Sequence, residues 1–370
     1  MNKRYRFFAI AFLCCFCFWS SPFIATAQVD TGDVIEADDE LDEFDMEGFE
    51  EADDTEIKVF CNNKINNLNP TTLIGLSYDF MFGAELESTN SDDSDSTFTY
   101  NSPINLNHGV RLDANVPLVS KSNIILNATF SYWESRYDFE TVDRRDPLAV
   151  ALNNNGLRTA TLGLLAFKPL DEKHFLIFQA ATSLNGNYTF GTYDFGEVEP
   201  DFGKMKYTAS VLYGWKKSDN QNIAIGITRT YRGGRLLHIP IFLWNKTFNK
   251  KWGMELLLPA RGGIRYNFSA LSSINFGYEL EGQSYLLQNS PSASDLFPTN
   301  NYELRKSEIR GRIMLNQALS SFIRLNLQAG VAPAYRFDLE DDGSNDGNQV
   351  SVGSLGLPMY FRIGLNFVSP

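Results

Sequence analysis

Apolar and polar side chains alternate over an unusually long stretch, "INLNHGVRLDANVPLV", which runs from Ile104 to Val119. The even positions are apolar, with His108 as the one exception, and most of the odd positions are polar. Period two indicates a β-strand, because successive side chains of a strand point to opposite faces. A strand usually has about 5–6 residues, whereas this one spans roughly 50 Å at about 3.3 Å per residue. The pattern therefore predicts a membrane-crossing strand, with one face toward lipid and the other toward a polar lumen.

The same alternation recurs through the rest of the chain. It is clearest in "TLIGLSYDFMFG", "NIILNATFSYW", "SFIRLNLQAGVAPAY" and "LGLPMYFRIGLNF". No segment has a convincing helical period of 3.6 residues over three turns. The sequence therefore predicts an all-β protein from about residue 70 to residue 370.

The connections between these segments fall into a short set and a long set. Short polar turns lie at 120–123, 170–173, 217–220, 248–251, 270–273 and 319–321, and long polar loops such as "ELESTNSDDSDSTFTYNS" lie between them. A soluble β-sandwich has no reason to sort its loops by length. Outer-membrane barrels do, because their turns are short on the periplasmic side and longer outside. We therefore expect a transmembrane, antiparallel, up-and-down β-barrel.

The strand count depends on two candidate tight turns on the outer side. At face value there are thirteen segments, which would leave the two ends of the chain on opposite sides of the membrane. Pro259 and the Gly262–Gly263 pair can divide "WGMELLLPARGGIRYNFS" into two strands, and "RGG" at 232–234 supplies the other tight turn. The prediction is about 14 strands with both ends periplasmic, and 12 strands if one of these turns is misread.

Residues 1–27 have the anatomy of a secretory signal peptide. Three basic residues precede an apolar run from Phe7 to Trp19, and the small-residue site Ala25–Ala27 predicts cleavage before Gln28. The alternative is a membrane anchor, but the run is shorter than the ~20 residues that a bilayer requires. Three of the four cysteines would leave with this segment, so Cys61 is the only cysteine of the predicted mature chain and cannot form an intramolecular disulfide.

An acidic segment follows, at 28–58. Residues 29–56 contain 15 of the 45 acidic residues and no lysine or arginine, which predicts disorder because so few apolar side chains cannot form a core. Loose calcium binding and contact with basic partners are alternatives to a solvated periplasmic tether. From Ile57 onward the chain has 30 acidic and 29 basic residues, so the formal net charge of −13 belongs to the tail. Nothing in the charge of the body indicates nucleic-acid binding.

Aromatic side chains near strand ends suit the interfacial girdles of a membrane barrel; they are Tyr78, Tyr132, Trp133, Tyr207, Trp215, Trp252, Tyr266 and Phe367. The segment from Pro240 to Leu287, with its "LLLP" ending at Pro259 and the following Arg265–Tyr266, resembles uncharacterised outer-membrane barrels of Gram-negative bacteria that form a domain of unknown function. The resemblance covers residues 70–370 and implies location and architecture without an activity. The expected partners are outer-membrane lipid, lipopolysaccharide and the barrel-assembly machinery; no oligomeric state is implied.

Charged residues with the parity of the polar strand face are the best functional lead. They are Arg111, Asp113, Lys206, Glu255, Arg265, Glu279, Glu281, Glu308, Arg310, Arg312, Arg324 and Arg362. Opposite charges on neighbouring strands can pair across the lumen wall. Such charges could form a constriction that selects solutes, or a salt-bridged plug that fills the barrel. The sequence leaves both interpretations open, because it gives no lumen radius.

Enzymatic activity is not expected. The chain has three histidines, of which only His238 is a lumen candidate, and no serine lies two residues from it. A lone histidine usually serves packing or hydrogen bonding. No zinc spacing, Walker loop or dinucleotide fingerprint occurs, so neither a metal nor a cofactor is predicted. The leading hypothesis is an outer-membrane channel or transporter for small solutes, and the alternative is a structural or surface-binding barrel with a closed lumen.

Overall fold

The computed structural model describes residues 61, 64–91, 97–190, 199–232, 235–288, 302–341 and 349–369. The predicted signal peptide and acidic segment lie outside these residues, so their assignment stays a prediction. All described residues belong to one compact unit, Ile57–Pro370. Among them, no helix is both long and apolar enough to cross a membrane.

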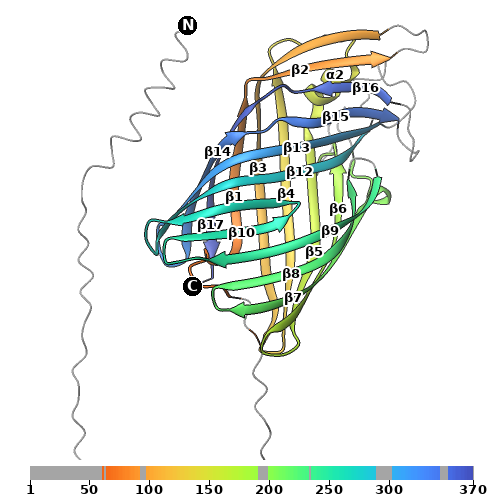
Figure 1. Cartoon of the computed structure of the whole chain (residues 1–370). Helices are drawn as coiled ribbons and strands as arrows, with labels where there is room; N and C mark the ends of the chain where they lie inside the picture. Colours follow the sequence, from red (N-terminus) through yellow and green to blue (C-terminus); the bar gives the residue numbers. More distant parts are fainter. Residues whose placement is uncertain are drawn as a thin grey trace, which may run out of the picture. The chain divides into compact units, whose positions relative to one another are not determined.

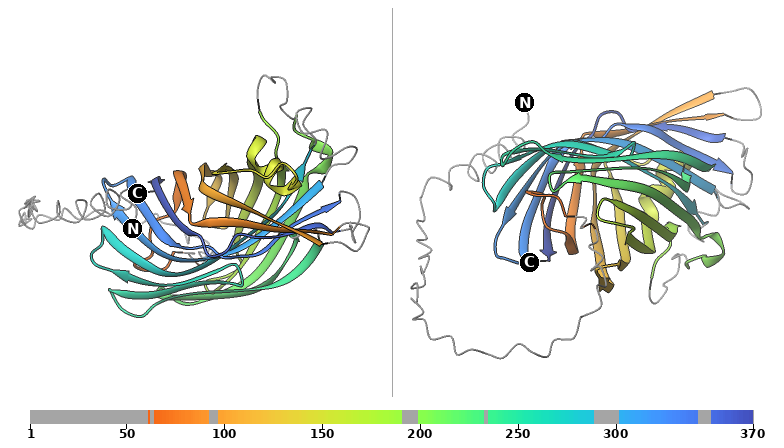
Figure 2. Two further views of the ribbon diagram at one scale, coloured as in Figure 1. Left: turned by 90° about the horizontal axis from the view of Figure 1, so that it is seen from above. Right: turned by 60° about the horizontal axis from the view of Figure 1, so that its bottom comes forward.

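The described strands form one continuous antiparallel sheet that closes on itself (Figures 1 and 2). The first pairs with the last: Ser77 in β1 lies opposite Gly364 in β17. The strands are β1 (Thr72–Phe82), β2 (Ala84–Ser91), β3 (Thr97–Lys121), β4 (Ile124–Phe139), β5 (Leu157–Pro169), β6 (His174–Gly186), β7 (Lys206–Ser218), β8 (Gln221–Arg232), β9 (Arg235–Thr247), β10 (Trp252–Leu258), β11 (Arg261–Asn267), β12 (Ser272–Leu287), β13 (Tyr302–Ala318), β14 (Ile323–Val331), β15 (Ala334–Asp341), β16 (Gln349–Ser354) and β17 (Met359–Val368).

These 17 segments make a closed barrel of 14 strands, which confirms the predicted count. Three strands of the ring are each broken into two segments: β1 continues as β2, β14 as β15, and β16 as β17. Gly83 and Gly356 lie at two of the breaks, with φ of 73° and 65°. This left-handed backbone favours glycine because it has no Cβ. The breaks let neighbouring strands change direction together.

The two ends of the barrel differ, as the loop lengths predict. Thr72, where β1 begins, pairs with Val368, where β17 ends, so both lie at the short-turn end. The tight turn between β10 and β11 is formed by Pro259 and Ala260, whereas Gly262 and Gly263 belong to β11. The predicted turn is therefore in the correct segment, but Gly262 and Gly263 were wrongly included in it. Both glycines are accommodated within a paired strand.

A short helix in the long β4–β5 loop was not predicted. Helix α2 (Pro147–Asn155) has Asp146 as its N-cap, whose carboxylate accepts a hydrogen bond from the Leu148 amide at 3.0 Å. Proline suits the first helical turn because that position needs no amide donor. Leu148 and Leu152 are fully buried in an apolar cluster with side chains from β2, β3, β4, β5, β12, β13 and β15. This cluster lies inside the long-loop half of the barrel.

The outward face of the barrel is apolar, as the alternation predicts. Leu162 in β5 is 61% exposed, and Ile225 in β8, Ile313 in β13 and Ile363 in β17 are also exposed. His108 lies on this face, where its Nδ1 is 2.5 Å from the hydroxyl of Tyr78 and its Nε2 is 3.3 Å from Asp138. The described residues thus form a transmembrane β-barrel of the outer-membrane type.

The wall is interrupted in the long-loop half. Pairing between β6 and β7 stops at Ser183 and Lys206, and β6 continues to Gly186, which lies beside Leu286 of β12. The β10–β11 hairpin ends below the tips of β9 and β12. The long-loop ends of β8 and β9 are therefore paired only with each other, from Thr230 and Leu237 onward.

Candidate functional site

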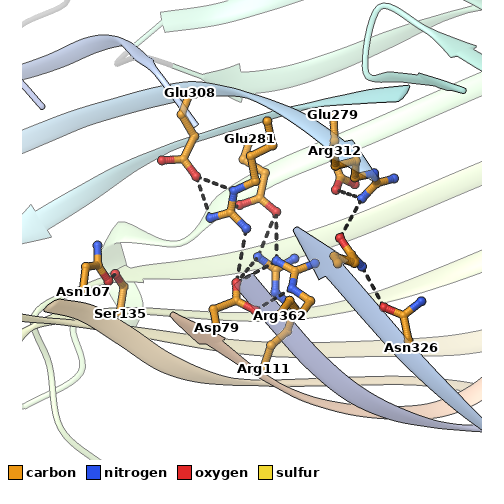
Figure 3. Close-up of polar contacts among 12 residues, drawn as sticks. Asp79, Asn107, Arg111, Ser135, Glu279, Glu281, Glu308, Arg312, Asn326 and Arg362 are labelled. Atoms are coloured by element: carbon orange, nitrogen blue, oxygen red, sulfur yellow. Dashed lines mark hydrogen bonds and ion pairs between the residues drawn. The ribbon is translucent and has the colours of Figure 1, made fainter. Parts of the chain in front are cut away.

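Several of the inward-facing charges meet in one network inside the barrel (Figure 3). Asp79 in β1 accepts two hydrogen bonds from Arg362 in β17, at 2.5 and 2.7 Å, and one from Arg310 in β13 at 3.2 Å. Two parallel bonds between a guanidinium and a carboxylate are strong and fix geometry. Asp79 therefore joins β13 to β1, although β14 and β17 lie between these strands in the ring.

Glu281 in β12 makes the second junction of the network. It lies 2.8 Å from Arg111 in β3 and 3.0 Å from Arg310. Arg310 also contacts Glu308 at 2.6 Å, and Glu308 lies 3.2 Å from the ammonium of Lys306. Strands that are not neighbours in the ring, such as β3 and β12, are thus connected by charged side chains. We call the set Asp79, Arg111, Glu281, Lys306, Glu308, Arg310 and Arg362 the charged layer.

Trp133 corrects one detail of the sequence interpretation. It was expected in an interfacial girdle, but its parity on β4 directs it inward. Its ring centroid lies 4.7 Å from the guanidinium of Arg111, 5.4 Å from the ammonium of Lys306 and 5.5 Å from Arg310. Cations are attracted to the face of an indole ring at such distances. Trp133 therefore supplies an aromatic wall to the charged layer.

The other predicted charges lie outside the charged layer. Arg312 forms an ion pair with Glu279 beside it. Arg265 is fully buried and lies 2.5 Å from Glu255, toward the short-turn end. The remaining three are separated from these pairs: Lys206 contacts Glu303 at 2.7 Å, Arg324 donates to Asn69 at 3.2 Å, and Asp113 lines a small interior cavity.

Several residues of the site were missed from the sequence. Asp79 and Lys306 belong to the charged layer, and Arg305 and Glu340 form a buried pair in the β13–β15 region. Asp79 was recognisable, because it occupies the polar parity of "TLIGLSYDFMFG". The partners of Arg305 were not, because a register irregularity between Ser307 and Glu308 shifts this part of β13 relative to β15.

Little space is left within the charged layer. A cavity of about 10 Å³ lies between Asp79, Trp133 and Arg310, and another of about 150 Å³ is lined by Arg111, Asp113 and other side chains. A single water needs roughly 10–15 Å³. The smaller of these two cavities therefore has room for no more than one water molecule.

A segment before β1 crosses the short-turn end. The Cys61 amide donates to the Asp171 carbonyl at 2.9 Å, and the Asn66 amide donates to the Asp219 carbonyl at 2.8 Å. Further along, the hydroxyl of Ser273 donates to the Asn69 side chain at 3.1 Å. We call the described residues of 61–69 the strap, because they extend from the β5–β6 turn past the β7–β8 turn to β12.

Two groups at this end have shifted pKa values. Backbone amides of Lys173 and His174 donate to the Asp171 carboxylate and lower its pKa to about 2. Burial raises the pKa of the Cys61 thiol, which is a free cysteine.

Among the described residues, no group of three or more histidine, cysteine or acidic side chains could hold a metal ion.

Comparison with known proteins finds no matching family model and no matching curated protein. Solved structures with a related arrangement are outer-membrane barrels. They include the KdgM porin (7% identity, covering 80% of this chain and 99% of that chain, TM-score 0.30), a FadL homologue of Pseudomonas aeruginosa (8%, 80% and 90%, TM-score 0.36) and the toluene transporter TodX of P. putida (7%, 82% and 91%, TM-score 0.33). These values assign the chain to none of these proteins' families.

Proposed function

We propose that the protein is exported by its N-terminal segment to the outer membrane of a Gram-negative bacterium and transports small polar solutes through a gated lumen. The charged layer is the gate, closed in this conformation. Its four basic and three acidic side chains leave one surplus positive charge facing a solute.

The observation that carries this proposal is the burial of so many charges in one interior layer. Arg310 and Glu308 are 3% and 1% exposed, and each is satisfied by charged neighbours. Buried ion pairs often stabilise a protein no more than well-packed apolar side chains of the same volume. A layer of ion pairs can, however, be opened by water and by a charged solute, which an apolar core does not allow.

A second candidate is a structural barrel that does not transport. Helix α2 and its apolar cluster lie inside the long-loop half, and the strap crosses the short-turn end. Transport therefore requires three parts to move: helix α2 with its apolar cluster, the strap and the charged layer. A purely structural role requires no movement.

Single-channel recording in planar bilayers distinguishes the two candidates. Glu281→Gln removes the carboxylate between Arg111 and Arg310, so the two guanidinium groups repel each other and the layer loosens. We expect brief openings of the wild type and more frequent openings of Glu281→Gln. Asp143→Asn, in an exposed loop ion pair with Arg145, is the control and should resemble the wild type. Silent wild-type and variant proteins, both folded by gel mobility, would favour the structural barrel.

A further inference from the structure

The lipid-facing surface between β5 and β9 is hollowed. Two cavities of about 1160 and 530 Å³ adjoin there and share Leu164, Ala180, Ala209 and Arg229 in their linings. The larger cavity also extends inward, where Lys206, Leu286 and Glu303 line it. The four shared residues are neighbours across successive strands, on the outward face. Ala180 and Ala209 form the base of this hollow, and their short side chains leave it unfilled. We call this hollow the β5–β9 groove.

Arg229 is unusual among the outward-facing residues of β8. Ile225 and Ile227, on the same face, are about half exposed, as lipid contact requires. Arg229 lies directly opposite His238 of β9, and both are exposed. The expectation that His238 faces the lumen is therefore wrong. Neither side chain has a hydrogen bond or ion pair within the described part of the chain. An arginine on the lipid face costs about 2–4 kcal/mol at the bilayer midplane and ~0–1 kcal/mol near the interface.

The position of Arg229 along β8 fits the interface. It lies three residues before Arg232, where β8 ends at the long-loop end and pairs with Arg235 of β9. At about 3.3 Å per residue and a tilt near 40°, this places it roughly 8 Å below the strand end. Lipid head groups occupy that depth, so the guanidinium can contact one while the groove below contacts hydrocarbon.

We propose that the β5–β9 groove binds an anionic, phosphate-headed lipid of the surrounding leaflet. An acyl chain of the lipid fills the β5–β9 groove, because side chains around an empty groove lack van der Waals contacts. The head-group phosphate accepts hydrogen bonds from Arg229, which offers a planar, two-pronged donor, and His238 adds a third. Lys206, in the inward part of the larger cavity, is already held by Glu303 at 2.7 Å and by the Ser284 carbonyl at 2.9 Å. Arg229 is therefore the head-group ligand.

The test is lipid retention by the full-length protein, measured by native mass spectrometry. Detergent micelles contain phosphatidylglycerol or phosphatidylcholine of identical chains. One surface cation contributes about 1 kcal/mol toward an anionic lipid, so we expect about a 5-fold preference of the wild type for phosphatidylglycerol. Arg229→Gln should abolish this preference, and Arg229→Lys should keep most of it. Arg136→Gln removes an outward-facing arginine that already has a carboxylate partner, Glu134 at 2.6 Å, and should change nothing.

A groove-filling variant tests the chain-binding part separately. Ala180→Leu should reduce retention of both lipids several-fold, because its side chain occupies the floor of the groove. The heat-dependent gel shift shows whether each variant is folded. Equal retention of the two lipids by the wild type, or an unchanged preference in Arg229→Gln, would overturn the proposal. So would displacement of phosphatidylglycerol by millimolar inorganic phosphate, because the chain would then contribute nothing.

Discussion

Asp79→Asn should destabilise the barrel more than any conservative change in an exposed loop. The substitution keeps the shape of the side chain but removes the carboxylate charge. The amide oxygen can still accept one of the two hydrogen bonds, of 2.5 and 2.7 Å, but Arg362 loses the other bond and its counter-charge, and its nearest other carboxylate oxygen, on Glu281, is 3.9 Å away. Arg310 loses one bond but keeps Glu281 and Glu308. The cost therefore arises mainly at Arg362, where a buried charge is left without a close partner.

The expected loss is about 3–5 kcal/mol in the free energy of unfolding, the usual cost of breaking a buried ion pair from one side. Asp79→Leu combined with Arg362→Met removes both charges and should recover most of it, to within about 1–2 kcal/mol of the wild type. Urea unfolding in detergent micelles, followed by tryptophan fluorescence, measures both. Asp143→Asn is the control. A loss in Asp79→Asn no larger than in the control, or a double variant as unstable as the single one, would refute the reasoning.

Three further predictions concern other parts of the barrel. Ile363→Arg, on the lipid face of β17 and five residues from its end, should cost about 2–4 kcal/mol near mid-bilayer, whereas Ile363→Ala should cost less. Equal losses in vesicle-based unfolding would argue against a lipid-facing position. Asp146→Ala removes the N-cap of α2 and should lower the stability of this helix by about 0.5–2 kcal/mol. The loss should appear as faster proteolysis of the β4–β5 loop, and an unchanged cleavage rate would contradict the capping role. The pKa of Asp171 is lowered to about 2, so its stabilising effect is present above about pH 4 and lost as the pH falls through 2. Asp171→Asn should therefore be less stable than the wild type at pH 7 and equal to it near pH 1–2, and a difference independent of pH would refute this.

The sequence predicted the architecture because period two is a property of the chain itself. Once Leu112 faces lipid, Arg111 and Asp113 must face the interior. The same parity placed Trp133 inside, but its aromatic character favoured a girdle position, and the parity proved the better guide. Loop lengths then placed each strand end, which was enough to count 14 strands.

The contacts of the charged layer could not be predicted in the same way. Asp79 and Arg362 are 283 residues apart, and their meeting depends on the closure and stagger of the barrel. The departure of β6 from β7 at Ser183 is likewise a tertiary feature. Helix α2 was missed because nine residues are too few for a periodic signal, although the Asp146–Pro147 pair is a recognisable helix start.

Nitroxide accessibility along β14 tests the central claim, a membrane barrel with a closed polar interior, most directly. In a Cys61→Ser background, single labels are placed at Leu325, Asn326, Leu327 and Gln328. We expect high collision rates with oxygen at the two leucines, which face lipid. At Asn326 and Gln328, both 7% exposed, we expect low rates with oxygen and with a water-soluble nickel chelate. High nickel accessibility at these two positions would mean an open, water-filled lumen, and equal oxygen accessibility at all four would contradict the barrel register itself.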